Sequence, residues 1–294
     1  METLEVTRRR LTTARELHGL VRTVKVLSAV ALRQNLNAAR IQEDYRRVLV
    51  EAFQALLRLP GAPSLAGPVR PGTACLVALG TDQGLCGPFN EGVRATVLAR
   101  PPTRLLVAGH RLEGSLVEAG LKPENVLGVP SSLAGVVPLV SQLVLHIESW
   151  SSHLTELTVD VLHQELKNGA RHEPVRTRLL PLDPAWLAEL ARAPWRSRGL
   201  PAAHLPPDHL LGLLLRQWLF SELYRAVVQS MAAECQARLL AMQAAEKALG
   251  DRVAELEREL QQLRQELVTD ELLDLVAGFE AVTAAGRNDP SRSV

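Results

Sequence analysis

The sequence predicts an α/β protein in which a long antiparallel coiled coil, made of the N- and C-terminal helices, carries an inserted Rossmann-like α/β domain. Residues 4–59 and 208–285 contain no proline and repeat their apolar residues at helical spacing. The intervening segment, 73–181, alternates short apolar runs with helical patterns. Such alternation is typical of parallel strands joined by crossover helices.

The N-terminal segment, 1–59, is predicted to be one helix of the coiled coil. Five apolar residues recur at spacings of three and four: Leu17, Leu20, Val24, Leu27 and Ala31. This spacing predicts a single apolar stripe along the helix. Pro60 and Gly61 end the helix and begin a proline- and glycine-rich linker that continues to residue 72.

The middle segment is predicted to form a mainly parallel sheet. Strands are expected at 73–79, 104–107 and 125–129, and helices at 89–100, 109–119 and 133–152. Residues 156–166 and 175–180 are two further strands without a helix between them, so they add a hairpin at one edge. Residues 182–207 are rich in proline and are expected to be an irregular return segment.

Residues 208–285 are predicted to form one helix, with Asp208 as its N-cap. Its apolar seam alternates spacings of four and three residues: Leu249, Val253, Leu256, Leu260, Leu263 and Leu267. About 75 helical residues extend about 110 Å at 1.5 Å per residue, which is more than a globular domain can enclose. The seam therefore predicts pairing with the N-terminal helix, followed by a tail at 286–294.

Composition excludes several classes of protein. The 33 basic and 32 acidic residues are balanced, which gives no support to nucleic-acid binding. Three scattered cysteines do not make a disulfide framework and are expected to be free thiols. No secretory signal is recognisable. The uncharged stretch Ser131–Ile147 is interrupted by Pro138 and is shorter than the ~20 apolar residues of a membrane helix. Any membrane association is therefore expected to depend on partner proteins.

A glycine-rich loop, GTDQGLCG at 80–87, lies between a predicted strand and a predicted helix, where a phosphate-binding loop would be found. Its spacing matches neither common phosphate motif, and Pro88 lacks a backbone N–H. A structural turn is the preferred interpretation, and a nucleotide-dependent enzyme with helical arms is the weaker alternative. Cys86 has no base fixed beside it, and the histidines lack metal-ligand spacing. We therefore expect no catalytic residue, cofactor or metal.

Three motifs resemble those of the gamma subunits of F-type ATP synthases. Residues 81–87 with Asn90 are similar to the TDRGLCGG signature, although Gln83 replaces arginine and Pro88 replaces the second glycine. Residues 221–242, SELYRAVVQSMAAECQARLLAM, resemble the family's SEQAARMxAM helix. Residues 264–278, RQELVTDELLDLVAG, resemble its ARQxxITxELxEIVxGA ending. The order of elements agrees over nearly the whole chain.

This resemblance implies a non-catalytic rotor, the central stalk. In the family, the paired terminal helices enter the bore of a hexamer of alpha and beta subunits. The α/β domain, together with the epsilon subunit, rides on the membrane ring of c subunits. Ion flow turns ring and shaft, and the shaft drives ATP synthesis or hydrolysis on the beta subunits. The implied location is the cytoplasmic face of the bacterial inner membrane, as a peripheral part of the complex, without nucleic acid.

The resemblance also implies partner-contact residues by position. Near the beta-subunit contact loops they are Arg264, Gln265, Thr269 and Glu271. On the N-terminal helix they are the cationic Arg22 and Lys25. In a loop near the foot of the shaft they are Asp82, Gln83 and Cys86. None is expected to be catalytic.

The N-terminal helix departs from the family pattern. Residues 17–29 read LHGLVRTVKVLSA, where the family has TQKITKAMKMVAA. Such a difference fits a divergent, alternative branch of bacterial F-type ATPases. A further alternative is a stand-alone coiled-coil scaffold with no ATPase partner, which would form a homo-oligomer through its seam.

Overall fold

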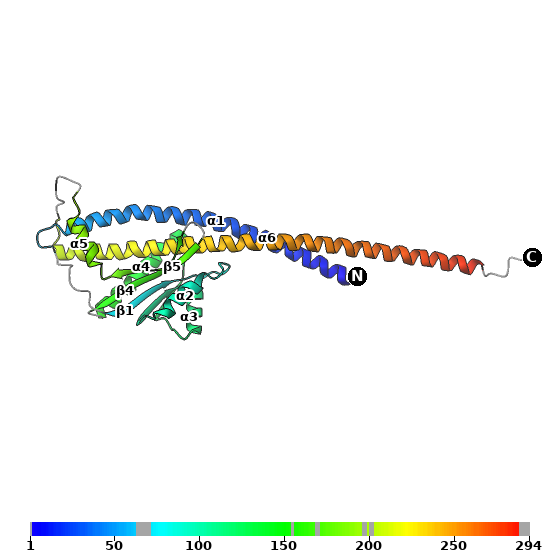
Figure 1. Ribbon diagram of the computed structural model, residues 1–294, viewed down its shortest axis with the longest axis horizontal. Helices are drawn as coiled ribbons and strands as arrows, with labels where there is room; N and C mark the ends of the chain where they lie inside the picture. The colour runs from blue at the N-terminus through cyan, green and yellow to red at the C-terminus, as the bar shows by residue number, and fades with distance from the viewer. Residues whose placement is uncertain are drawn as a thin grey trace, which may run out of the picture. The chain divides into compact units, whose positions relative to one another are not determined.

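A five-stranded sheet forms the centre of the larger of two units in the computed structural model (Figure 1). The larger unit comprises Lys25–Ala241, and the smaller one comprises Met1–Val24 with Met242–Val294. Helices α1 (Glu2–Leu56) and α6 (Pro207–Arg287) contribute to both units. The structure describes residues 2–62, 72–153, 156–167, 171–195, 199 and 203–287.

The strands of the sheet are β1 (Thr73–Leu79), β2 (Arg104–Ala108), β3 (Asn125–Leu127), β4 (Leu157–Lys167) and β5 (Arg171–Leu180). They lie in the order β3-β2-β1-β4-β5. The first four strands pair in parallel, and β5 pairs antiparallel with β4. The predicted parallel sheet with a hairpin at one edge is therefore confirmed.

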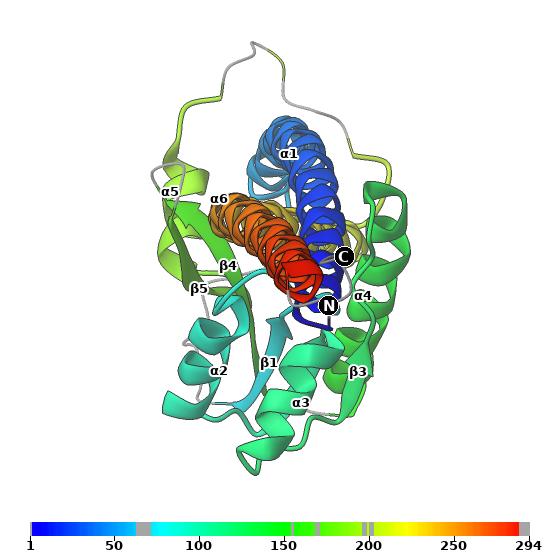
Figure 2. The same cartoon turned by 90° about the vertical axis from the view of Figure 1, so that its right-hand side faces the viewer.

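Alternate residues of the strands face two separate helical layers. On one face, Leu76 and Leu162 pack against α2 (Phe89–Ala99) and α3 (His110–Glu118). On the other face, Val77 and Val161 pack against α4 (Val136–His153) and α6. Figures 1 and 2 show α2 and α3 on the side of the sheet away from α6. Burial on both faces explains why the strands are continuous apolar runs.

Helix α4 belongs to the core although its composition resembles that of a membrane span. Among the described helices, its window Leu133–Ser151 is long and apolar enough to cross a membrane, with a mean hydropathy of 1.3. The window extends beyond Ile147 and so includes the charged residue Glu148. Val140, Leu143 and Ile147 are nevertheless buried against the sheet and α6. This packing is that of the core helix of a globular domain.

Within the larger unit, α1 and α6 run antiparallel. The amide of Asn35 lies 3.7 Å from Cys235 Sγ, and Gln42 Nε2 donates a hydrogen bond to Ser221 Oγ at 2.9 Å. As the residue number on α1 rises from 35 to 42, the number of the contacting residue on α6 falls from 235 to 221. The two helices therefore run in opposite directions. The predicted antiparallel pairing is confirmed.

Within the smaller unit, the same two helices also pair antiparallel. Four apolar side chains form the seam: Leu11, Ala14, Leu256 and Leu260. Arg15 and Glu257 flank it with an ion pair of 2.6 Å. The seam predicted on α6 is thus found at Leu256, which is 2% exposed, and at Leu260.

The face of α1 that packs against α6 is not the predicted stripe. Leu17, Leu20 and Leu27 are 47%, 62% and 63% exposed. The buried positions follow a seven-residue repeat and include polar residues: Thr7, Ala14, Ser28, Asn35, Leu49 and Leu56. A search for apolar periodicity cannot find a partly polar seam. The predicted stripe was therefore wrong for Leu17, Leu20 and Leu27, whereas Val24 and Ala31 are half-buried.

The proline-rich segment 182–207 contains a helix that was not predicted. Helix α5 spans Pro184–Arg192, and the side chain of Asp183 caps its first turn. Trp186 on this helix stacks on Trp218 of α6 with the ring centroids 5.0 Å apart. Proline at the first helical position is compatible with a helix. The high proline content therefore did not exclude a helix in this segment.

Proline also lies in the first turns of α4 and α6. Helix α6 begins at Pro207, so Asp208 lies within the first turn and is not the N-cap. Pro138 is the third residue of α4. A proline there removes no helical hydrogen bond, because the first N–H groups have no partner within the helix.

Candidate functional site

The loop between β1 and α2 is the best-defined candidate site of the larger unit. It carries the sequence 80–87 and follows the carboxyl end of β1, the edge at which open α/β sheets bind ligands. Leu85 and Gly87 adopt left-handed backbone conformations, with φ of 64° and 59°. Gly84 lies so close to α3 that an added Cβ would be 2.7 Å from Arg111 Nη1. The loop is therefore folded tightly onto its neighbours.

Asp82 joins three loops at this edge of the sheet. Its Oδ1 accepts a hydrogen bond from the backbone N–H of His110, the first residue of α3, at 2.7 Å. Its Oδ2 accepts one from the backbone N–H of Val129, just beyond β3, also at 2.7 Å. A carboxylate at the start of α3 is further favoured by the helix dipole. Both oxygens of this predicted contact residue thus have partners inside the domain.

Helix α6 contacts the same loop through Arg238. Its Nε donates a hydrogen bond to the Gly84 carbonyl oxygen at 3.3 Å, and its guanidinium pairs with Glu234 one turn earlier. Burial raises the pKa of the Glu234 carboxyl, whereas the bond from Arg238 lowers it. Helix α6 therefore packs against the loop at the carboxyl end of β1.

Cys86 is a core residue of this junction. It is 5% exposed and packs against Phe89 of α2 and against Ala233 and Ala237 of α6. Burial raises the pKa of its thiol, and the nearby Glu234 carboxylate raises it further. The thiol is therefore protonated at neutral pH, which is unsuited to nucleophilic catalysis.

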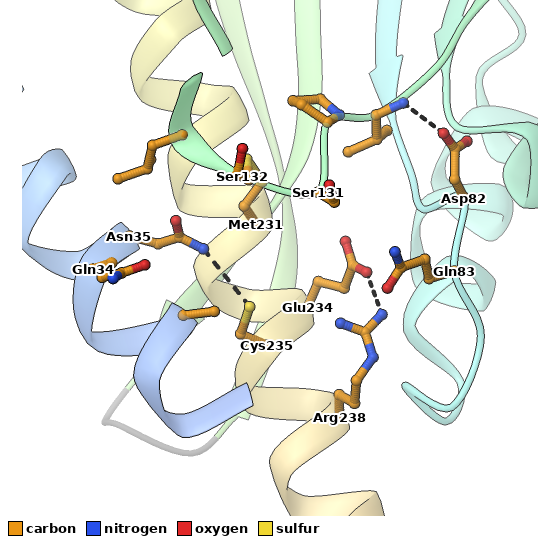
Figure 3. Close-up of a pocket in the computed structure, with 14 residues that line it drawn as sticks. Gln34, Asn35, Asp82, Gln83, Ser131, Ser132, Met231, Glu234, Cys235 and Arg238 are labelled. Atoms are coloured by element: carbon orange, nitrogen blue, oxygen red, sulfur yellow. Dashed lines mark hydrogen bonds and ion pairs between the residues drawn. The ribbon is translucent and has the colours of Figure 1, made fainter. Parts of the chain in front are cut away.

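A small cavity of about 90 Å³ lies between this loop and the two long helices (Figure 3). Its polar lining comes from four segments: Gln34, Asn35, Asp82, Gln83, Ser131, Ser132, Glu234, Cys235 and Arg238. Asp82 and Glu234 already have internal partners, so neither carboxylate needs a bound ion. Over the residues that the structure describes, no three His, Cys, Asp or Glu side chains gather as a metal would require.

Four predicted contact residues of the smaller unit lie on the surface of α6: Arg264, Gln265, Thr269 and Glu271. Thr269 Oγ1 donates a hydrogen bond to the Gln265 carbonyl oxygen at 2.8 Å. Glu271 lines a groove together with residues of α1 that include Leu4 and Arg8. Their side chains can therefore reach a partner without any change in the helix.

The end of α6 exposes a large apolar surface. Every side chain from Val268 to Glu280 is exposed. The large apolar ones are Val268, Leu272, Leu273, Leu275, Val276 and Phe279. Contiguous apolar surface of this kind marks a site of protein–protein or membrane contact. This segment is the strongest structural sign of a partner.

Arg22 and Lys25 lie on α1 at the boundary between the two units. Arg22 is exposed and belongs to the smaller unit, whereas Lys25 is half-buried and belongs to the larger one. Of the two, Arg22 is the better placed for contact with another chain. The contact roles of both residues stay predictions.

Two contacts of the cavity were not predicted from the sequence. The Glu234–Arg238 pair could have been found, because an acid and a base four residues apart share one face of a helix. The contact of Asn35 with Cys235 had a weaker signal. Asn35 falls on the seven-residue repeat of α1, where a polar residue specifies the register of a coiled coil.

Comparison with known proteins gives a consistent relationship. The model of the ATP synthase family matches residues 3–282. The chain is 28% identical to the ATP synthase gamma chain of Granulibacter bethesdensis over 303 aligned residues, which cover 96% of this chain and 100% of that protein.

Solved structures of mitochondrial ATP synthases have similar folds. A chain of the Euglena gracilis OSCP/F1/c-ring assembly matches with a TM-score of 0.70 and 14% identity, covering 100% of this chain and 99% of that one. A chain of the Euglena gracilis rotor matches with a TM-score of 0.65 and 14% identity, covering 91% and 99%. A chain of the Tetrahymena thermophila central stalk and c-ring gives 0.56 and 16%, covering 77% and 99%. Because the family model spans nearly all of the chain, the chain belongs to the ATP synthase family, in which it corresponds along its length to the gamma chain.

Proposed function

We propose that this chain is the central-stalk rotor of an F-type ATP synthase or ATPase. It couples ion-driven rotation of a membrane c-ring to ATP synthesis or hydrolysis on a hexamer of alpha and beta subunits. The observation that carries the proposal is the exposed apolar end of α6, from Val268 to Glu280. Such a helix end needs an apolar sleeve around it, and the bore of a hexamer provides one.

The proposal assigns partners to the two units separately. In the smaller unit, Arg264, Gln265, Thr269 and Glu271 contact the beta subunits near the sleeve, and Arg22 adds a cationic contact. In the larger unit, Gln83 is exposed beside the cavity and contacts a subunit near the foot of the shaft. The epsilon subunit and the c-ring bind the α/β domain. Support comes from the family and from the exposure of these side chains.

In this proposal the chain is not catalytic itself. Both carboxylates beside β1 have partners within the chain: Asp82 accepts from two backbone N–H groups, and Glu234 pairs with Arg238. Burial keeps the Cys86 thiol protonated. These contacts favour a mechanical role, with ATP chemistry on the beta subunits. By family resemblance, the chain in this proposal lies at the cytoplasmic face of a bacterial inner membrane. The burial of α4 in the core supports attachment as a peripheral part of the complex.

Reconstitution tests the rotor proposal. The purified full chain is mixed with alpha and beta subunits from the same genome, and co-elution and ATP hydrolysis are followed. We expect one copy of this chain per hexamer and faster hydrolysis when it is present. A homo-oligomer of the chain that leaves hydrolysis unchanged would overturn the proposal in favour of the coiled-coil scaffold. Truncation of α6 before Arg264 removes the exposed segment and should weaken the stimulation while the larger unit stays folded.

A further inference from the structure

Three polar residues on one face of α6 form the centre of a hydrogen-bond network. Glu222, Arg225 and Gln229 are spaced by three and four residues, so they lie on a single stripe of the helix. The stripe adjoins the apolar positions of α6, such as Leu219 and Leu223, that pack in the core. The side chain of Glu222 is only 5% exposed. A buried carboxylate requires compensating partners, and both of its oxygens have them.

One oxygen of Glu222 binds α1. Oε1 accepts a hydrogen bond from Arg46 Nε at 2.8 Å. The Arg46 guanidinium also lies over the ring of Trp218, one turn before Glu222 on α6, at 5.2 Å from the centroid. Helix α6 therefore holds Arg46 both by the ion pair with Glu222 and by the cation–π contact with Trp218. This ion pair joins α1 to α6 in the larger unit.

The other oxygen connects to the sheet. Oε2 accepts a hydrogen bond from Arg225 Nη2 at 2.8 Å, and Arg225 Nη1 donates to Gln229 Oε1 at 3.2 Å. The same Gln229 oxygen lies 3.0 Å from Nε2 of His163, a fully buried residue of β4. Gln229 Nε2 donates to Glu165 of β4 at 3.5 Å. The network thus extends from α1 through α6 to the sheet.

Such a network does what apolar packing cannot do. Leu219, Leu223 and Val227 fix the distance between α6 and the sheet, but apolar contacts are non-directional and tolerate small rotations and slips. Hydrogen bonds between charged groups depend on angle and register. Glu222 accepts from Arg46 of α1 and from Arg225 of its own helix, and Arg225 in turn donates to Gln229, which contacts β4. The network therefore fixes the rotation of α1 on α6 directly and supports that of α6 on the sheet through Gln229.

We propose that Glu222 is the positioning residue that makes α1 and the α/β domain turn together with α6. The proposal rests on the rotor function and adds where torque passes from the paired helices to the domain. Loss of the Glu222 charge leaves the Arg225 and Arg46 guanidinium groups without their shared acceptor. The helices then stay packed through their apolar contacts, but α1 can twist on α6, and Gln229 holds α6 to β4 without the support of the Glu222–Arg225 pair.

The test compares Glu222→Gln with Glu43→Gln. Glu43 is a matched control because it pairs with the same Arg46, at 3.6 Å, but is 53% exposed and lies on α1 alone. Each variant, and the wild type, is assembled with alpha, beta, epsilon and c subunits in sealed vesicles. ATP hydrolysis and ATP-driven ion uptake are measured on the same sample. Amide hydrogen exchange of the assembled chain is followed around Arg46 in α1 and around His163 in β4.

We expect Glu222→Gln to retain hydrolysis while ion uptake per ATP falls about threefold, and exchange at both sites to accelerate about tenfold. Glu43→Gln should change either quantity less than about twofold, as exposed pairs contribute little. Arg46→Gln should reproduce the α1 part of the effect, and adding it to Glu222→Gln should add little. Equal uptake ratios in Glu222→Gln and Glu43→Gln would overturn the proposal. Failure of the wild type to pump would instead refute the rotor function.

Discussion

Replacement of Asp82 by alanine tests whether the signature loop holds the edge of the sheet together. The carboxylate accepts two backbone N–H groups at 2.7 Å, from the starts of two different segments. A hydrogen bond to a charged group contributes about 1.5–3 kcal/mol. Because Asp82 is half-buried and His110 is exposed, water can replace part of this. We therefore expect Asp82→Ala to lower the free energy of unfolding by about 3 kcal/mol, at the lower end of the summed range.

Urea unfolding of the isolated chain, followed by tryptophan fluorescence at pH 7, measures this change. The neighbouring Gln83→Ala is the matched control, because Gln83 is exposed in the same loop and should cost less than about 0.5 kcal/mol. Asp82→Asn keeps one acceptor oxygen and loses the charge at the start of α3, so it should fall between the two.

Equal midpoints for Asp82→Ala and Gln83→Ala would refute the reasoning, since water would then replace both bonds without loss. An Asp82→Asn midpoint equal to that of the wild type would show that one neutral acceptor is enough. In that case, neither the charge nor the second bond stabilises the loops. A loss confined to Asp82→Ala in the isolated chain also separates this internal role from any contact with a partner subunit.

The seam of the smaller unit should be sensitive to loss of apolar side chains. In urea unfolding of that unit, Leu256→Ala should lower the free energy of unfolding by about 2–4 kcal/mol. Leu275→Ala, at a position that is 70% exposed, should lower it little. Burial lowers the pKa of His163 to about 4 from 6.5, so the unfolded chain takes up the proton first. Relative to His163→Gln, the free energy of unfolding should be highest above pH 6.5 and should fall by about 3 kcal/mol toward pH 4. A difference between the two proteins that does not change with pH would contradict this. Burial raises the pKa of Cys235 to about 11 and also raises that of Cys86. Both thiols should react with a soluble disulfide reagent at pH 8 only after unfolding in urea, and fast reaction of the native chain would be the contrary result.

The elements of the α/β domain were predictable because their signals are local. Strands buried on both faces are continuous apolar runs, and the loop 80–87 is rich in glycine. The helix α5 was missed because proline counts as a breaker in a search by composition, although Pro184 occupies the one turn where it is tolerated. The order of strands follows from tertiary packing, which periodicity does not report.

The candidate site was less predictable than the fold. Motif resemblance located Asp82 and Cys86, but not what they do inside the chain. Their partners, Val129 and Ala233, lie far along the sequence. The same holds for Glu222. Its spacing of three residues from Arg225 can be read from the sequence, whereas its bond to Arg46 on another helix cannot. Contacts between distant segments require the fold before they can be inferred.

Helix α1 leaves several of its leucines largely exposed, and this arrangement needs an explanation. Leu17, Leu20 and Leu27 are about half exposed, while Asn35 is 3% exposed in the seam. Burial of each leucine would add about 1 kcal/mol to the pairing, so the helix is not built for the tightest pair. A polar seam instead specifies one register. The outward leucines, like the end of α6, then favour surfaces that other chains cover, and a stand-alone pair of helices would have no use for them.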